Sequence, residues 1–159
     1  MKSEEEELSD GQDEQGKQSL SWNQALLATT APFQQISFSQ VQKISPSALA
    51  YLGDAIYELY VRIFYLVPLQ RSGIYHRLVV EQVRAETQAL HLRSLIPHLR
   101  DTELEIVRRG RNAATGRPKR LNPEIYQQAT SLETLIGYLY LTDYQRLTEL
   151  LQILHVEKE

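Results

Sequence analysis

Two acidic residues of this chain lie close to glycines inside segments that otherwise favour helix. Asp54 directly follows Gly53, and Glu133 precedes Gly137 by about one helical turn. Glycine weakens a helix interior by roughly 1 kcal/mol relative to alanine, so its presence there usually marks a close approach of backbones. Carboxylates are ligands for hard cations. Two acids this far apart, however, do not form a metal-binding motif of the His-Glu-x-x-His kind.

Both acids also lie away from the apolar stripes of their predicted helices. Asp54 points roughly opposite a stripe made by Leu52, Ile56, Leu59 and Ile63. Glu133 shares a flank with Tyr126, Thr130 and Gly137, apart from the stripe Leu132, Leu135, Ile136 and Leu139. From spacing alone two interpretations stay open: either the acids belong to a site, or they are ordinary residues on solvated faces and the glycines only allow tight helix packing.

A basic segment, residues 108–120, contains six bases and no acid. The bases are Arg108, Arg109, Arg111, Arg117, Lys119 and Arg120. Gly110, Gly116 and Pro118 disfavour helix, which predicts a basic loop between two helices. Such a loop can contact a phosphate backbone, or it can be basic simply to stay solvated.

The elements that must position these residues are predicted to be helices throughout, which makes the fold class all-α. Ser45-Pro46 predicts the start of a long helix that closes before Pro68. The further predicted helical segments are Trp22–Leu27, Phe38–Lys43, Ile74–Leu99, a helix from Asp101 to Arg109, a helix from Asn122-Pro123 to about Leu141, and a last helix capped by Asp143 with the stripe Leu147, Leu150, Leu151 and Leu154.

Composition predicts one catalytic domain over residues 18–159, preceded by a disordered acidic tail over residues 1–17. The tail holds seven of the 20 acids and two of the 17 bases, so the net charge of −3 hides a mildly basic body. The chain contains no cysteine, which excludes thiolate chemistry and cysteine-ligated zinc and favours the cytoplasm. The four histidines share no metal-ligand spacing. The longest apolar stretch, residues 48–68, is interrupted by charges, so no membrane span is expected.

Two segments resemble the ribonuclease III family. Ala48-Leu-Ala-Tyr-Leu-Gly-Asp-Ala-Ile-Tyr-Glu58 is similar to the family's signature helix, and Thr130-Ser-Leu-Glu-Thr-Leu-Ile-Gly-Tyr-Leu-Tyr-Leu141 to its second acidic helix. Between them, residues 76–89 are similar to the family's middle helix, so the resemblance covers about residues 45–142. It implies a ribonuclease III endonuclease-like helical bundle in which Asp54 and Glu133 hold Mg²⁺.

The sequence departs from full-length members of that family in two ways. Their additional acids are replaced by Ser47, Ala50 and Thr130, and no double-stranded-RNA-binding domain is expected after the second acidic helix. Both departures, with the run Arg108-Arg-Gly-Arg-Asn-Ala, resemble the Mini-ribonuclease III group. For that group we expect a magnesium-dependent endoribonuclease that cuts double-stranded RNA and matures the large-subunit (23S) ribosomal RNA precursor in the cytoplasm.

The resemblance also implies partners. We expect a homodimer, each protomer cutting one strand, with room for a ribosomal-protein helper. The six bases of residues 108–120 are expected to contact the RNA backbone, together with His76 and Arg84 on the middle helix. Two rival interpretations remain: a non-catalytic RNA-binding ribosome-assembly factor on the same scaffold, and a helical interaction module with no nucleic-acid role.

Overall fold

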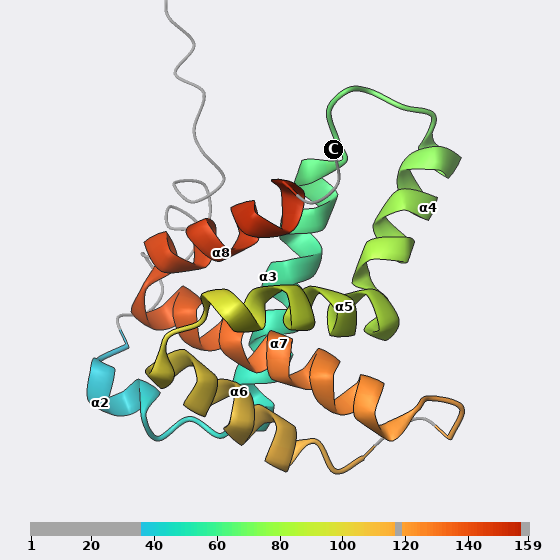
Figure 1. Ribbon diagram of the computed structural model, residues 1–159. Helices are drawn as coiled ribbons and strands as arrows, with labels where there is room; N and C mark the ends of the chain where they lie inside the picture. Colours follow the sequence, from blue (N-terminus) through green and yellow to red (C-terminus); the bar gives the residue numbers. More distant parts are fainter. Residues whose placement is uncertain (1–35, 117–118, 157–159) are drawn as a thin grey trace, which may run out of the picture.

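Helices joined by short turns make up residues 36–116 and 119–156, which are the residues that the computed structural model describes; these ranges contain no strand. Figure 1 shows the elements α2 (Phe38–Val41), α3 (Pro46–Phe64), α4 (Ser72–Val83), α5 (Ala85–Leu95), the 3₁₀ helix η1 (Ile96–His98), α6 (Asp101–Ala113), α7 (Pro123–Thr142) and α8 (Tyr144–Val156). The all-α prediction is confirmed. The predicted tail and the helix Trp22–Leu27 fall outside the described residues. No helix in the described ranges is long and apolar enough to span a membrane.

Three helices begin at the capping residues that the sequence indicated. Ser45 accepts a hydrogen bond from the Ala48 amide at 3.2 Å, and Asn122 accepts one from the Glu124 amide at 2.8 Å. Asp143 accepts one from the Arg146 amide at 3.0 Å before α8. Each side chain satisfies an N–H group that the first helical turn leaves without a partner. The caps therefore fix where α3, α7 and α8 start.

Helix α7 is the centre of the fold. Helices α3, α5 and α6 pack against it from different directions, and α8 returns after a sharp turn (Figure 1). The predicted stripes of α7 and α8 are both buried in one hydrophobic core, which confirms them: Leu132, Leu135, Ile136, Leu139, Leu147, Leu150, Leu151 and Leu154. A carboxylate placed on a flank of α7 is thereby held by the most firmly packed helix of the domain.

The predicted stripe of α3 is only partly correct. Ile56 is buried, but Leu59 and Ile63 are 40% and 41% exposed, while Tyr57 and Tyr60 are buried instead. Helix α3 carries apolar residues on several faces, so periodicity could not identify the face that α7 covers. The exposed face carrying Leu59 and Ile63 is left over once that contact has formed.

Two predicted boundaries were also wrong. The expected helix over residues 74–99 is broken at Arg84, whose extended backbone (φ −67°, ψ 152°) turns the chain between α4 and α5. The expected end of α6 near Gly110 is instead at Ala113. A Cβ at Gly110 would lie 2.5 Å from Thr134 Oγ1, so this glycine lets α6 lie tightly on α7. That packing offsets the low helix propensity of glycine.

Candidate active site

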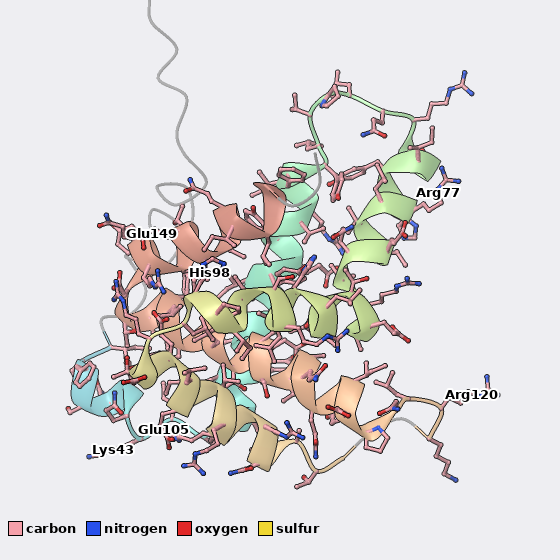
Figure 2. The ribbon with its side chains drawn as sticks, in the orientation of Figure 1. Lys43, Arg77, His98, Glu105, Arg120 and Glu149 are labelled. Carbon is pink, nitrogen blue, oxygen red and sulfur yellow. The ribbon has the colours of Figure 1, made fainter. Side chains whose placement is uncertain are left out.

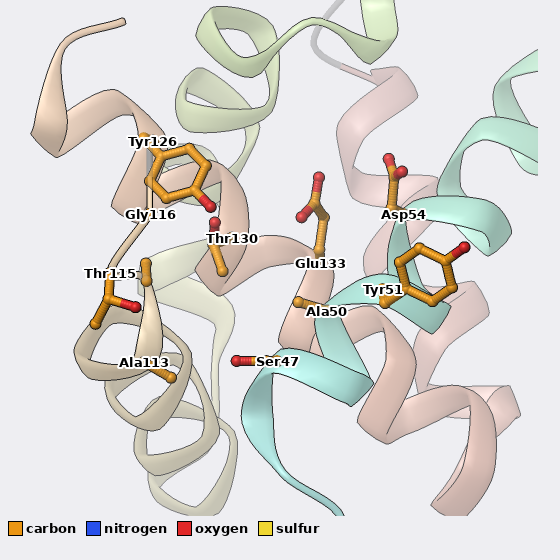
Figure 3. Close-up of a pocket in the computed structure, with 11 residues that line it drawn as sticks. Ser47, Ala50, Tyr51, Asp54, Ala113, Thr115, Gly116, Tyr126, Thr130 and Glu133 are labelled. Atoms are coloured by element: carbon orange, nitrogen blue, oxygen red, sulfur yellow. The ribbon is translucent and has the colours of Figure 1, made fainter. Parts of the chain in front are cut away.

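The site begins where α3 crosses α7 with the two backbones in contact. A Cβ added to Gly53 would overlap the carbonyl oxygen of Glu133, and one added to Gly137 would overlap that of Leu49. Only glycine fits at these two points, as the sequence suggested. Because Asp54 adjoins Gly53 and Glu133 contributes the contacting carbonyl, the crossing brings the two acids together. In Figure 3 their side chains extend in the same direction from neighbouring helices.

Both acids line a pocket of about 400 Å³ between α3, α7 and the C-terminal end of α6. Ser47, Ala50 and Thr130 line the same pocket. These are the positions at which the resemblance places further acids in full-length family members. Five positions from two distant segments therefore converge here, although only Asp54 and Glu133 carry charge.

In this pocket both carboxyl groups are harder to deprotonate than free side chains. Burial, and then the nearby negative charge of Asp54, raise the pKa of Glu133 to about 7, although a hydrogen bond from Gln88 acts in the opposite direction. Burial, and then the charge of Glu58, raise the pKa of Asp54 as well. Two acids that resist losing both protons together form an electrostatic environment that a cation relieves.

The donor set suits Mg²⁺ better than a metal that needs many protein ligands. Within residues 36–116 and 119–156, no three His, Cys, Asp or Glu side chains gather into a group that could hold a metal. Mg²⁺ demands oxygen ligands but keeps several waters, so two carboxylates and a substrate phosphate can suffice. The repelling oxygens of Asp54 and Glu133 therefore fit this ion.

Two tyrosines line the pocket from opposite sides. Tyr126, which the sequence placed on the flank of Glu133, lies on the α7 side, and Tyr51 lies on α3 (Figure 3). Tyr51 was not singled out from the sequence, and it is 86% exposed. Its position three residues before Asp54, one turn along the same helix face, was the signal that could have identified it.

The predicted basic residues do not form one loop, because the first three lie on a helix. Arg108, Arg109 and Arg111 belong to the last turns of α6, and Arg108 is paired with Glu105. Residues 113–116 line the pocket itself, while Lys119 and Arg120 are exposed beyond it. Arg120 extends away from the body in Figure 2. Arg117 falls outside the described residues.

The two candidates on the middle helix do not line this pocket. His76 lies on α4 in a separate hollow of about 200 Å³, together with Glu58, Arg62 and Tyr75. Arg84 lies at the break between α4 and α5, where its Nε donates to Thr87 Oγ1 at 3.3 Å. Contact of either residue with RNA stays a prediction.

Comparison with known proteins shows to which family the chain belongs. The Ribonuclease III domain family matches residues 47–144. A Mini-ribonuclease 3 of Synechocystis sp. is 56% identical over 85% of this chain and 90% of the relative, and one of Gloeobacter violaceus is 46% identical over 72% and 84%. A crystal structure of a Fusobacterium nucleatum protein superposes with a TM-score of 0.67 at 30% identity, covering 72% of this chain and 95% of that one. The chain belongs to the ribonuclease III family, within its Mini-ribonuclease III group.

Proposed function

We propose that this protein is a magnesium-dependent endoribonuclease that cleaves double-stranded RNA as a homodimer. The observation that carries the proposal is the pairing of Asp54 and Glu133 in one pocket, at the crossing of α3 and α7 that the two glycines permit. The family to which the chain belongs consists of ribonucleases by name. The basic residues beside the pocket supply attraction for a polyanion.

Phosphodiester hydrolysis needs an activated water and charge neutralisation at the phosphate. Bound Mg²⁺ supplies both. In this chain Asp54 and Glu133 would hold the ion from two helices whose relative position is fixed by backbone contact. The pocket is open enough to admit a phosphate beside the carboxylates. Ser47 and Thr130, which line it, offer hydroxyl groups where further carboxylates are absent.

The direct test is cleavage of long duplex RNA with and without Mg²⁺, followed on a denaturing gel. We expect Mg²⁺-dependent cutting that Glu133→Gln abolishes. Glu149→Gln makes the same chemical change at an exposed position on α8 and is expected to cut like the unaltered protein. Salt-sensitive binding without cutting would favour the assembly factor instead, and neither binding nor cutting would reject any role on duplex RNA.

The RNA is proposed to be held through its backbone rather than its bases. Duplex RNA presents a wide minor groove lined with 2′-hydroxyls and phosphates, which side chains read mainly as shape. Lys119 and Arg120 are exposed near the pocket without an ion pair to an acid in the described chain. They can therefore bind a phosphate without first breaking an ion pair. Arg108, by contrast, is paired with Glu105.

Replacing Lys119 and Arg120 by alanine is expected to weaken binding to duplex RNA and to flatten its salt dependence. Each phosphate that the protein no longer neutralises should reduce the slope of log K against log salt by roughly 0.9. Fluorescence anisotropy in EDTA measures this without cleavage. Lys43→Ala removes one exposed charge on the opposite side of the view in Figure 2 and should leave the slope unchanged. An unaltered slope in the double variant would contradict the proposed phosphate contacts.

The proposed dimer interface is the exposed apolar surface of α3 and its neighbours. It comprises Leu59, Ile63, Phe64, Leu66, Val67, Leu69, Ile74 and Val80. The C-terminal part of α3, the following turn and α4 extend beyond the helices packed on α7 (Figure 1). Exposed apolar residues gathered on neighbouring elements typically mark a protein interface. A two-fold dimer would place one pocket on each strand of a duplex, which has the same symmetry.

The change Leu59→Glu is expected to convert the dimer to a monomer. A two-fold interface would bury two new charges, each costing several kcal/mol, so the dissociation constant should rise at least about a hundredfold. Light scattering coupled to size-exclusion chromatography measures the mass. Leu90→Glu introduces the same charge on α5, where Leu90 is 56% exposed, and should leave the dimer intact. An unchanged dimer in Leu59→Glu would place the interface elsewhere.

As substrate we propose the large-subunit ribosomal RNA precursor, cut in the cytoplasm with a ribosomal-protein helper. The support is the membership of the Mini-ribonuclease III group, together with the recognition of duplex shape proposed above. Reconstituted cleavage of a precursor stem, compared with an unrelated duplex of equal length, tests this choice. Equal cutting of both would reject selectivity by the protein alone.

A further inference from the structure

Gln88 is a buried amide that the proposed chemistry does not yet use. It lies on α5 with 2% of its surface exposed. The other buried polar residues have partners that account for them: Glu103 pairs with Arg146, while Ser131 and Thr134 donate to carbonyls one turn earlier on α7. Gln88 instead reaches out of its own helix in two directions.

One direction is the break between α4 and α5. Gln88 Nε2 donates to the carbonyl oxygen of Val83 at 2.9 Å. Val83 ends α4, and the extended backbone of Arg84 interrupts the helix after it. Because a carbonyl oxygen only accepts hydrogen bonds, this contact fixes which end of the amide faces the break.

The other direction is the active site. The Gln88 side chain also lies close enough to Glu133 to lower the pKa of that carboxylate. The amide nitrogen has two hydrogens, so it can hold Val83 and Glu133 together. Its oxygen, Oε1, has no hydrogen-bond partner within the described residues. An unpartnered buried acceptor destabilises a fold, and an apolar side chain of the same size would avoid it. The unpartnered oxygen makes an amide costly at this position, so its donor groups must account for it.

We propose that Gln88 is a positioning residue that holds the Glu133 carboxylate toward Asp54, in the orientation that binds the metal. This inference rests on the proposed function, because it gives Glu133 the role of a metal ligand. Helices α5 and α7 pack against each other along this contact. Gln88 thereby connects the ligand to the end of α4 as well as to its own helix. Partners of this kind orient a metal-binding side chain without touching the metal.

The test compares Gln88→Met, which keeps the volume and removes the donors, with Ser131→Ala, which removes a different buried hydrogen bond from α7. Mg²⁺ binding to the RNA-free protein is measured by calorimetry and thermal unfolding is measured alongside. For Gln88→Met we expect the Mg²⁺ dissociation constant and the Mg²⁺ concentration for half-maximal cleavage to rise about 10- to 100-fold. Cleavage at saturating Mg²⁺ should largely recover, and the unfolding temperature should fall no more than in Ser131→Ala, because each variant loses one hydrogen bond to a backbone carbonyl. Ser131→Ala should lower the unfolding temperature and leave Mg²⁺ binding unchanged.

Unchanged Mg²⁺ affinity in Gln88→Met, alongside normal binding by the unaltered protein, would overturn the role of Gln88 and leave the proposed function standing. If the unaltered protein neither binds Mg²⁺ nor cleaves RNA, the proposed function fails. A crystal structure of metal-free Gln88→Met then tests, without any activity measurement, whether Gln88 positions Glu133. A displaced Glu133 carboxylate is the expected result, and an unmoved one overturns the positioning role whatever the activity.

Discussion

Gly53→Ala is expected to destabilise the protein and to abolish cleavage together. The added Cβ would meet backbone atoms of Glu133 closer than 3.0 Å, and backbone cannot rotate away as a side chain can. Helices α3 and α7 must separate, which reopens the core on both sides of the crossing. We expect a decrease of about 2–3 kcal/mol in the free energy of unfolding, even after the gain of about 1 kcal/mol in helix propensity. Urea unfolding measures it.

Gly73→Ala is the matched control for this change. Gly73 lies in α4, and a Cβ there would meet nothing within 4 Å. The substitution should therefore stabilise the protein by about 0.4–1 kcal/mol through the unfolded chain and leave cleavage intact. If Gly53→Ala behaved like Gly73→Ala, the two backbones would not be in contact, and the geometry of the site would have to be redrawn.

Asp54→Asn is expected to lower the rate of RNA cleavage and to raise the stability of the protein. Removal of one charged metal ligand should lower the rate of RNA cleavage by at least about a hundredfold. The metal-free protein should become more stable at pH 8 by about 1 kcal/mol, because residue 54 no longer repels the buried Glu133 carboxylate. The gain stays this small because Asp54 is partly exposed to solvent. Asp101→Asn, on the exposed first turn of α6, should change neither quantity appreciably. Near-normal cleavage by Asp54→Asn would show that Asp54 is not an essential metal ligand.

The pH dependence of stability provides an independent check on the same pair. The pKa of Glu133 is about 7 in the folded protein against 4.5 for the free side chain. The folded state therefore binds more protons between these values, and the unfolding free energy of metal-free protein should fall as pH rises from about 4.5 to 7. In Asp54→Asn the unfolding free energy should fall less over this pH range. In Glu133→Gln the part of the fall that comes from Glu133 should be absent. A stability curve that is identical in all three proteins would contradict the charge coupling.

The sequence by itself determined the elements whose signals are local. Ser45, Asn122 and Asp143 indicated where α3, α7 and α8 begin, because a capping side chain acts within one turn of its own position. The apolar stripes of α7 and α8 were readable because leucine and isoleucine recur at helical spacing along each of these helices. The two acids were also recognisable, since they lie off those stripes beside glycines that helix propensity alone would not favour.

Only the tertiary structure decided what depends on neighbours. It chose the buried face of α3, where Leu59 and Ile63 proved exposed, because several faces of that helix are apolar and α7 covers only one. It carried α6 past Gly110, because close packing against Thr134 outweighs the local preference of glycine. It also brought Glu133 of α7 into one pocket with Ser47, Tyr51 and Asp54 of α3. These two helices are distant in sequence, and no periodicity within one helix specifies which residues of another will lie against it.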